Sequence, residues 1–186
     1  LREGLSASED IFGPVWPAAH RRWMWLFINL VTAFIASRVI SVFEGTIEQL
    51  VALATLMPIV ASIGGNTGNQ TVALFIRGHA LSQINDSNVR YLALKEISIS
   101  LINGAIWGSL MGLVAYALYQ DVMLGVVMAT ATFLNLIVAA ATGVLAPLTL
   151  SKMGRDPAFG SSVLLTFTTD SMGLFIFLGL ATVFLL

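Results

Sequence analysis

A single carboxylate, Asp170, lies in an otherwise uncharged apolar segment, residues 158–186. A charge at that depth of a membrane-spanning helix is costly unless water, a cation or a partner meets it, and such residues usually serve a function. On a helix, Ser162, Thr166, Asp170 and Gly173 share one face because they are spaced by four, four and three residues. The sequence therefore predicts a functional stripe of hydroxyls and one carboxylate.

The composition places the chain in a bilayer. Hydrophobic residues make up 57% of its 186 positions and charged residues 10%, with a mean hydropathy of +0.88, which is too apolar for a soluble globule. We expect no cleavable signal peptide, since residues 1–10 lack a basic region beside a short apolar core. The dispersed basic residues and net charge of −1 argue against nucleic-acid binding.

Metal chemistry in this chain has to use oxygen ligands. There are no cysteines, which excludes disulfides and thiolate sites. His20 and His79 are too few for a typical zinc centre.

The hydrophobic pattern predicts an all-α integral membrane protein with five transmembrane helices. Each apolar run exceeds the roughly 20 residues that cross a hydrocarbon core of about 30 Å. The predicted spans are residues 23–43, 49–77, 94–119, 122–150 and 157–186. We interpret residues 1–19 as an interfacial or linker segment and residues 20–186 as a five-helix transmembrane domain.

The distribution of Lys and Arg predicts the orientation. Basic residues flank the first span and fill the loops after the second and fourth spans, whereas the two opposite loops have none. This predicts a multi-pass protein of the cell (inner) membrane, with a cytoplasmic amino terminus and the carboxyl terminus outside. The residues are Arg21, Arg22, Arg77, Arg90, Lys95, Lys152 and Arg155.

A second unusual stretch lies inside the second predicted span. Glycine weakens helices, and irregular backbone is tolerated in a membrane only beside protein or water. We predict that this stretch, together with Pro58, interrupts the span and lines a cavity. The alternative is close helix packing with amide hydrogen bonds between helices. The residues concerned are Gly64, Gly65, Asn66, Gly68, Asn69 and Gln70.

Glycines at four-residue intervals in the third span, Gly104, Gly108 and Gly112, predict close approach of another helix. Asn135, in the fourth span, is expected to form a hydrogen bond to a neighbouring helix. Arg38, near the end of the first span, is expected to reach the interface or to pair with Glu44.

Two acidic residues lie close to the basic loops. Asp156 is expected to cap a helix that begins at Pro157. Glu96 either pairs with Lys95 or a loop arginine, or faces a pore entrance.

The two unusual stretches are predicted to meet near mid-membrane. At about 1.5 Å per residue, Asp170 lies about 20 Å from Pro157 and Asn66 about 16 Å from Arg77. One carboxylate with hydroxyls, amides and carbonyls suits an ion that keeps its water shell, and Mg²⁺ gives up water reluctantly. A two-fold dimer with two copies of Asp170 across the axis would strengthen the site.

These residues also resemble the membrane domain of the MgtE family of magnesium channels, over about residues 22–186. The resemblance implies a homodimeric five-helix domain whose pore follows the dimer axis and is lined by the second and fifth helices. It is carried by Phe43-Glu44, Pro58, Gly64-Gly65-Asn66, Gly68, Gln70, Arg77-Gly78, Glu96, Asp156-Pro157-Ala158, Thr169-Asp170 and Gly173.

The resemblance implies roles for individual residues. Asp170 would be the principal metal-site residue, with the backbone carbonyl around Thr166 and the region of Asn66 helping to hold hydrated Mg²⁺. Asp156, and with it Glu96, would lie at the cytoplasmic mouth. The pore-lining set would comprise Gly64, Gly65, Gly68, Asn69, Gln70, Ser162, Thr169 and Gly173.

This chain departs from the family pattern in three ways. Family members usually carry cytoplasmic regulatory domains that sense Mg²⁺. We expect the present residues to represent the membrane domain alone, because none of them forms such a domain. Val163 stands where the family often has proline, and Thr71 where serine is common.

The leading hypothesis is passive, selective transport of hydrated Mg²⁺, with other divalent cations as further candidates, and no enzymatic activity. A proton- or sodium-coupled carrier is the first alternative. An intramembrane aspartyl protease is a remote alternative because no second deep aspartate is present. A structural assembly subunit would leave Asp170 unexplained.

Overall fold

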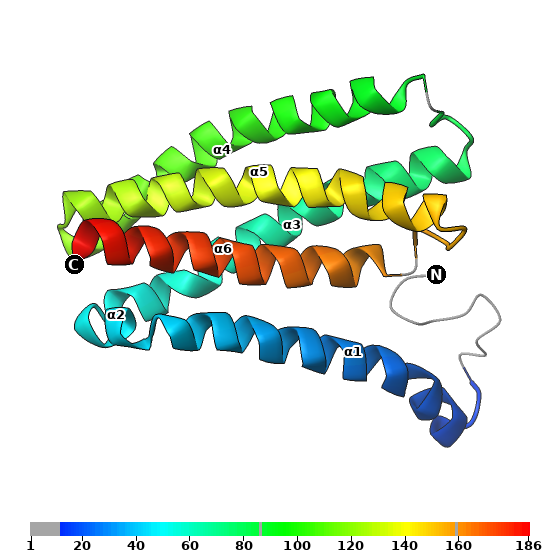
Figure 1. Ribbon diagram of the computed structural model, residues 1–186, viewed down its shortest axis with the longest axis horizontal. Helices are drawn as coiled ribbons and strands as arrows, with labels where there is room; N and C mark the ends of the chain where they lie inside the picture. Colours follow the sequence, from blue (N-terminus) through cyan, green and yellow to red (C-terminus); the bar gives the residue numbers. More distant parts are fainter. Residues whose placement is uncertain (1–11, 86, 159) are drawn as a thin grey trace.

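The computed structural model describes residues 12–85, 87–158 and 160–186, which fold into helices joined by short turns (Figure 1). Among these residues there is no strand, in agreement with the predicted all-α class. The helices are α1 (Val15–Val42), α2 (Glu44–Gln49), α3 (Ala52–Ala80), α4 (Val89–Tyr119), α5 (Val122–Lys152) and α6 (Ser161–Leu185).

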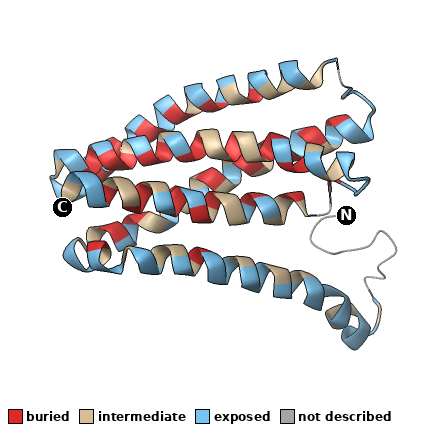
Figure 2. Cartoon of the chain, in the orientation of Figure 1, coloured by how far each residue is buried: buried red, intermediate tan, exposed pale blue. Residues whose placement is uncertain are grey.

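Helix α5 is the centre of the fold. It packs against α3, α4 and α6, whereas α1 packs mainly against α6 (Figure 1). The colouring in Figure 2 shows buried positions concentrated on α3, α5 and α6, and a largely exposed α1. Ala36 is the one residue of α1 in the buried class. A helix this apolar and this exposed suits contact with lipid.

Four of the described helices, α1, α4, α5 and α6, have the length and apolar composition of a membrane span. Helix α3 has 29 residues, which is about 43 Å at 1.5 Å per residue, yet it is not among the four. Its glycines and amides interrupt the apolar character that the other long helices keep. The prediction of five spans is therefore supported for four helices.

Three helices begin four or more residues away from the predicted start of their span; α4, for example, begins at Val89 and not at residue 94. Helix α1 begins at Val15, earlier than predicted, so it takes in residues 15–19 of the predicted interfacial segment, whose residues 1–11 lie outside the described residues. Helix α6 begins at Ser161 and not at Pro157. Gly160, with φ of 91°, places a left-handed residue directly before α6, a conformation that glycine adopts without steric cost.

The predicted interruption of the glycine-rich stretch is also wrong, because α3 runs through it without a break. Pro58 lies inside this helix, where it removes one backbone donor. Gly64 and Gly68 are buried where a Cβ would meet Asn135 of α5 and Leu165 of α6. These neighbours cover the backbone, so close packing offsets the low helix propensity of glycine.

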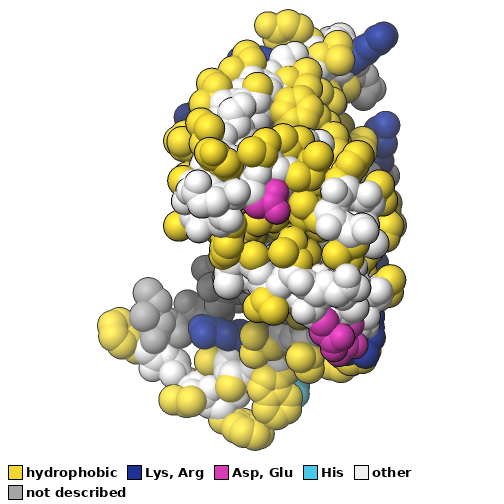
Figure 3. Space-filling model, turned by 90° about the vertical axis from the view of Figure 1, so that its left-hand side faces the viewer, with side chains coloured by type: hydrophobic (Ala, Val, Ile, Leu, Met, Phe, Trp, Pro, Cys, Tyr) yellow, Lys and Arg dark blue, Asp and Glu magenta, His cyan; other side chains and the backbone are white. Residues whose placement is uncertain are grey.

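The two ends of the bundle differ in charge. One end of the bundle holds the start of α1 and the α3–α4 and α5–α6 turns (Figure 1). Six of the basic residues belong to this end, and Lys95 follows in the second turn of α4; the six are Arg21, Arg22, Arg77, Arg90, Lys152 and Arg155. The opposite end holds α2 and the α4–α5 turn, with Glu44, Glu48 and Asp121. Figure 3 shows acidic groups among apolar side chains on that opposite end.

Arg38 does not form the predicted ion pair with Glu44 within the described part of the chain. Its guanidinium lies 5.1 Å from the ring centroid of Phe34 and donates to Ser37 Oγ at 3.4 Å. Arg38 and Glu44 do line the same surface cleft. A cation over an aromatic face is favourable at an exposed site, which explains the position of the side chain.

The predicted glycine stripe of α4 forms a packing seam with α5. A Cβ on Gly108 would lie 2.8 Å from the carbonyl oxygen of Ala129, and one on Gly112 would lie 2.6 Å from that of Gly125. Backbone atoms cannot move aside as side chains do. The prediction of close helix approach along this stripe is therefore confirmed.

Candidate functional site

The polar stripe of α6 forms as its spacing predicts. Ser162 and Asp170 are partly buried and Thr166 is exposed. In the described part of the chain, no hydrogen bond or ion pair satisfies the Asp170 carboxylate, although Asp170 lies inside a helix with the properties of a membrane span. A carboxylate in this position requires water, a cation or a second protein surface.

Helix α3 supplies polar groups at the same level. Ser162 Oγ donates to Asn69 Oδ1 at 3.4 Å, and a Cβ on Gly65 would lie 3.9 Å from Thr169 Oγ1. These contacts set an antiparallel register that puts Asn66 level with the turn of α6 before Asp170. Asn66 and Gln70 are exposed. The predicted meeting of the two polar stretches at one depth is confirmed.

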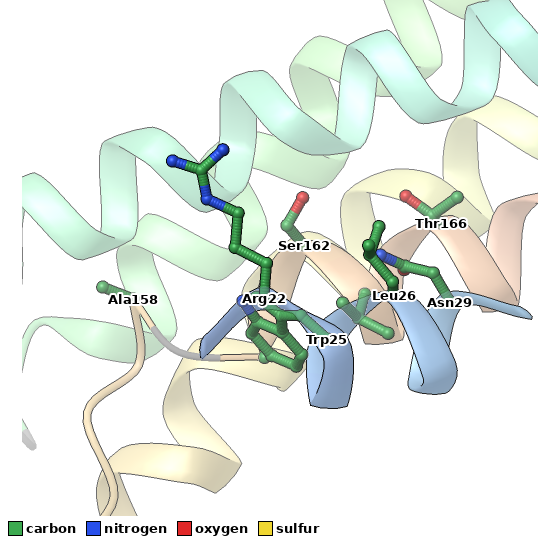
Figure 4. A pocket seen from close by; sticks show the side chains of 9 residues that line it. Arg22, Trp25, Leu26, Asn29, Ala158, Ser162 and Thr166 are labelled. Carbon is green, nitrogen blue, oxygen red and sulfur yellow. The ribbon is translucent and has the colours of Figure 1, made fainter. Parts of the chain in front are cut away.

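A cavity of about 390 Å³ lies between α1 and the first turns of α6. Figure 4 shows Arg22 and Asn29 on the α1 side and the hydroxyls of Ser162 and Thr166 on the α6 side. Arg22 and Asn29 are not among the predicted site residues. The available signal was that these two polar residues are seven positions apart in an apolar helix and therefore share one face.

Three residues of the predicted pore-lining set are packing positions inside the chain. Gly64 and Gly173 both face the Asn135 side chain, and Gly68 faces Leu165. Asn135 Nδ2 donates to the carbonyl oxygen of Val60 at 2.8 Å, which confirms its predicted role between helices. That these three glycines also border a pore stays a prediction.

The carbonyl oxygen of Thr166 accepts hydrogen bonds within α6. Buried Thr169 donates its hydroxyl to Leu165 O at 3.0 Å and to Thr166 O at 3.3 Å. Thr166 O is also the acceptor of the helical hydrogen bond from the N–H of Asp170 within α6, so both of its lone pairs have a donor in the single chain. The role of this carbonyl in holding a hydrated ion stays a prediction, and it requires the Thr169 hydroxyl to bond to Leu165 O alone.

Glu96 has a hydrogen-bond partner that was not among those predicted. It is buried between α4 and α3 and accepts a hydrogen bond from Thr71 Oγ1 at 3.0 Å. No ion pair with Lys95 or a loop arginine is found among the described residues. Thr71 and Glu96 are 25 residues apart and lie in different helices, so spacing along the chain does not predict this contact.

Asp156 lies in the turn between α5 and α6 and is exposed. Its Oδ1 accepts from the backbone N–H of Ala158 at 2.9 Å. Asp156 therefore stabilises the turn before α6, and the predicted helix cap is wrong. Asp156 belongs to the basic end of the bundle, and its position at the cytoplasmic mouth of a pore stays a prediction.

One chain provides few ligands for a bare metal ion. Within the described residues, there is no group of three or more His, Cys, Asp or Glu side chains that could hold a metal. Hydroxyl, amide and carbonyl oxygens around one carboxylate can accept hydrogen bonds from the water shell of a cation. The arrangement offers oxygen acceptors to the water shell of a cation.

Comparison with known proteins agrees with this chemistry. The MgtE family profile, described as a divalent cation transporter, matches residues 57–180. The magnesium transporter MgtE of Bacillus subtilis is 37% identical over 90% of this chain. The magnesium transporter MgtE of Thermus thermophilus is 33% identical over 93% of it.

These matches cover 37% and 38% of the two relatives, so the chain spans less than two fifths of their length. The family is one of transporters and not of enzymes. The profile match includes α3 from Met57 onward, α4, α5 and α6 through Leu180. The chain belongs to the MgtE family of divalent cation transporters.

Proposed function

We propose that this chain forms the pore of a homodimeric channel that lets hydrated Mg²⁺ pass down its gradient, with other divalent cations as lesser substrates. The observation that carries the proposal is Asp170, a carboxylate in a membrane-spanning helix without a protein partner among the described residues. A hydrated cation supplies the missing counter-charge without fully losing its water.

The pore is lined by α3 and α6. Asn66 and Gln70 on α3, and Thr166 on α6, are exposed in the single chain. The Asn69–Ser162 contact joins the two helices on this side. Polar side chains left exposed between apolar helices are costly against lipid, so we assign this surface to a water-filled path.

A second copy completes the site. Because one chain offers a single deep carboxylate, two-fold symmetry would place two copies of Asp170 around one path and double its charge. The same arrangement would cover the polar face of α3, which is too polar to lie against lipid. In this assembly α3 crosses the membrane in addition to α1, α4, α5 and α6, and it is enclosed by protein.

The basic end of the bundle faces the cytoplasm of the cell (inner) membrane, and the carboxyl terminus lies outside. The excess of Lys and Arg at one end supports this orientation. Entry to the pore from inside passes Asp156 on the turn before α6. The longer relatives are named magnesium transporters, and cytoplasmic regulatory domains are the expected partners.

Proteoliposomes test passive transport against coupled transport. Mg²⁺ entry is followed with a trapped fluorescent indicator, first with only a Mg²⁺ gradient and then with an added proton or sodium gradient. A passive channel takes up Mg²⁺ when only the Mg²⁺ gradient is present. At a fixed membrane potential, the added proton or sodium gradient leaves this uptake rate unchanged. Uptake that requires a proton or sodium gradient would contradict the channel and favour the carrier.

A further inference from the structure

A second groove lies beside the start of α1 and shares Trp25, Gly160 and Val163 with the lining of the cavity in Figure 4. Its volume is about 470 Å³, and α1, the end of α5 and the start of α6 enclose it. Two guanidinium groups, from Arg21 and Arg155, belong to its lining. The rest of the lining is mainly apolar, and includes Met24, Ile28, Leu150 and Leu164.

The backbone places Arg155 at this groove. Gly154, with φ of 69°, follows the end of α5. Its N–H donates to Ser151 O at 3.0 Å, and the N–H of Arg155 donates to Leu150 O at 2.9 Å. These two bonds form a Schellman motif, which requires a residue that tolerates the left-handed conformation. Arg155 is thereby fixed next to Leu150, where charged and apolar parts of the groove meet.

The surroundings of the groove indicate a membrane interface. Met24 and Leu164 are exposed hydrophobic residues on helices with the properties of membrane spans. Trp16, Trp23 and Trp25 belong to the same end of α1, and tryptophan is enriched at the level of lipid head groups. Within the described residues, the Arg155 side chain has no hydrogen-bond or ion-pair partner.

We propose that this groove binds an anionic phospholipid, with its phosphate between Arg21 and Arg155 and an acyl chain against Met24, Ile28, Leu150 and Leu164. Guanidinium groups bind phosphate through paired hydrogen bonds. Basic pockets between transmembrane helices on the cytoplasmic side are suited to anionic head groups. The charge pattern selects this occupant over a zwitterionic lipid, whose head group carries a compensating cation.

This binding is independent of whether the protein conducts Mg²⁺, so its test uses lipid binding alone. The purified protein in a neutral detergent is titrated with phosphatidylglycerol, with phosphatidylcholine or with inorganic phosphate, and bound molecules are counted by native mass spectrometry. Phosphatidylglycerol is expected to bind more tightly than phosphatidylcholine. Inorganic phosphate is expected neither to bind measurably alone nor to displace the lipid.

The double variant Arg21→Gln/Arg155→Gln removes the charged half of the groove. Two lost contacts are expected to weaken phosphatidylglycerol binding by about 30-fold and to leave phosphatidylcholine binding unchanged. Leu164→Trp fills the apolar half without changing charge, and is expected to weaken binding of the same lipid. Arg90→Gln, on the same end but outside the groove, is the matched control and is expected to bind as wild type does.

Several results would overturn the proposal. These are equal binding of the two lipids, wild-type binding by both groove variants, or an equal loss in Arg90→Gln, which would show a general surface charge effect. Displacement of the lipid by inorganic phosphate would assign the groove to a free anion. Loss of the dimer in the double variant, measured by the mass of the complex, would assign the groove to a second copy of the chain.

Discussion

Asn135 of α5 donates a hydrogen bond of 2.8 Å to the carbonyl oxygen of Val60, which ties the central helix to α3 one turn before its glycine-rich stretch. The same side chain lies against Gly64 of α3 and Gly173 of α6. One amide is thus enclosed by three helices. It fixes how α3 and α6 face each other, and therefore where the polar stripe with Asp170 lies.

Gly64→Ala is predicted to destabilise the protein. Its Cβ would overlap with the Asn135 amide, which cannot move aside because Gly173 encloses it and Val60 binds it. Overpacking of this kind costs about 1–3 kcal/mol. Thermal unfolding in detergent, followed by circular dichroism or tryptophan fluorescence, measures the effect.

Gly65→Ala is the matched control, since it adds the same methyl group to the next residue of α3. Its Cβ would meet only Thr169 Oγ1, at 3.9 Å, an ordinary contact. Alanine favours a helix over glycine by up to about 1 kcal/mol, so this variant should melt at or above the wild-type temperature. If Gly64→Ala were as stable as Gly65→Ala, the proposed enclosure of Asn135 would be wrong.

The glycine-rich stretch of α3 was only partly predictable from the sequence. The level of Asn66 relative to Asp170 agrees with the prediction, because Asn69 contacts Ser162 and Gly65 faces Thr169. The helix was nevertheless predicted to break, because the sequence does not show which side chain covers each glycine. Asn135 and Leu165, far away in the chain, supply that cover.

Gly173 illustrates the same point on α6. Its spacing puts it on the face of Ser162, as predicted, but at its level that face meets Asn135 of α5. Spacing along one helix gives the face, whereas the neighbour at each level depends on how helices pack. Hydropathy, in contrast, is a local signal, and it predicted the order of the long helices well.

Thr71→Val tests the buried contact between α3 and α4. The change keeps the shape of the side chain but removes the hydroxyl that donates to Glu96 Oε2 at 3.0 Å. A buried polar group left without its partner costs about 1–3 kcal/mol. Thermal unfolding should therefore occur at a lower temperature than in wild type.

Thr130→Val is the comparison for Thr71→Val. The Thr130 hydroxyl is exposed and donates to Val126 O within its own helix, so its loss should be close to neutral. Equal stability of the two variants would show that the Thr71–Glu96 hydrogen bond does not contribute to folding.

The absence of cysteine from the sequence makes the proposed orientation directly testable. A cysteine at Gln83, in the turn after α3, should be shielded from a membrane-impermeant thiol reagent in intact cells. A cysteine at Glu48, an exposed residue of α2, should react, because α2 lies at the opposite end. Permeabilised cells should label both positions. The reverse pattern in intact cells would place the basic end outside.

Mg²⁺ flux through Asp170→Asn in proteoliposomes tests the central claim most directly. The change keeps the size of the side chain and removes the charge that a hydrated cation is proposed to meet. Thr168→Val, on the same helix with its hydroxyl bonded to Leu164 O at 2.8 Å, is the control. We predict that Asp170→Asn lowers flux by more than about tenfold, which corresponds to about 1.4 kcal/mol, with folding and dimer mass unchanged and Thr168→Val conducting normally. Wild-type flux through a well-folded Asp170→Asn dimer would contradict the account.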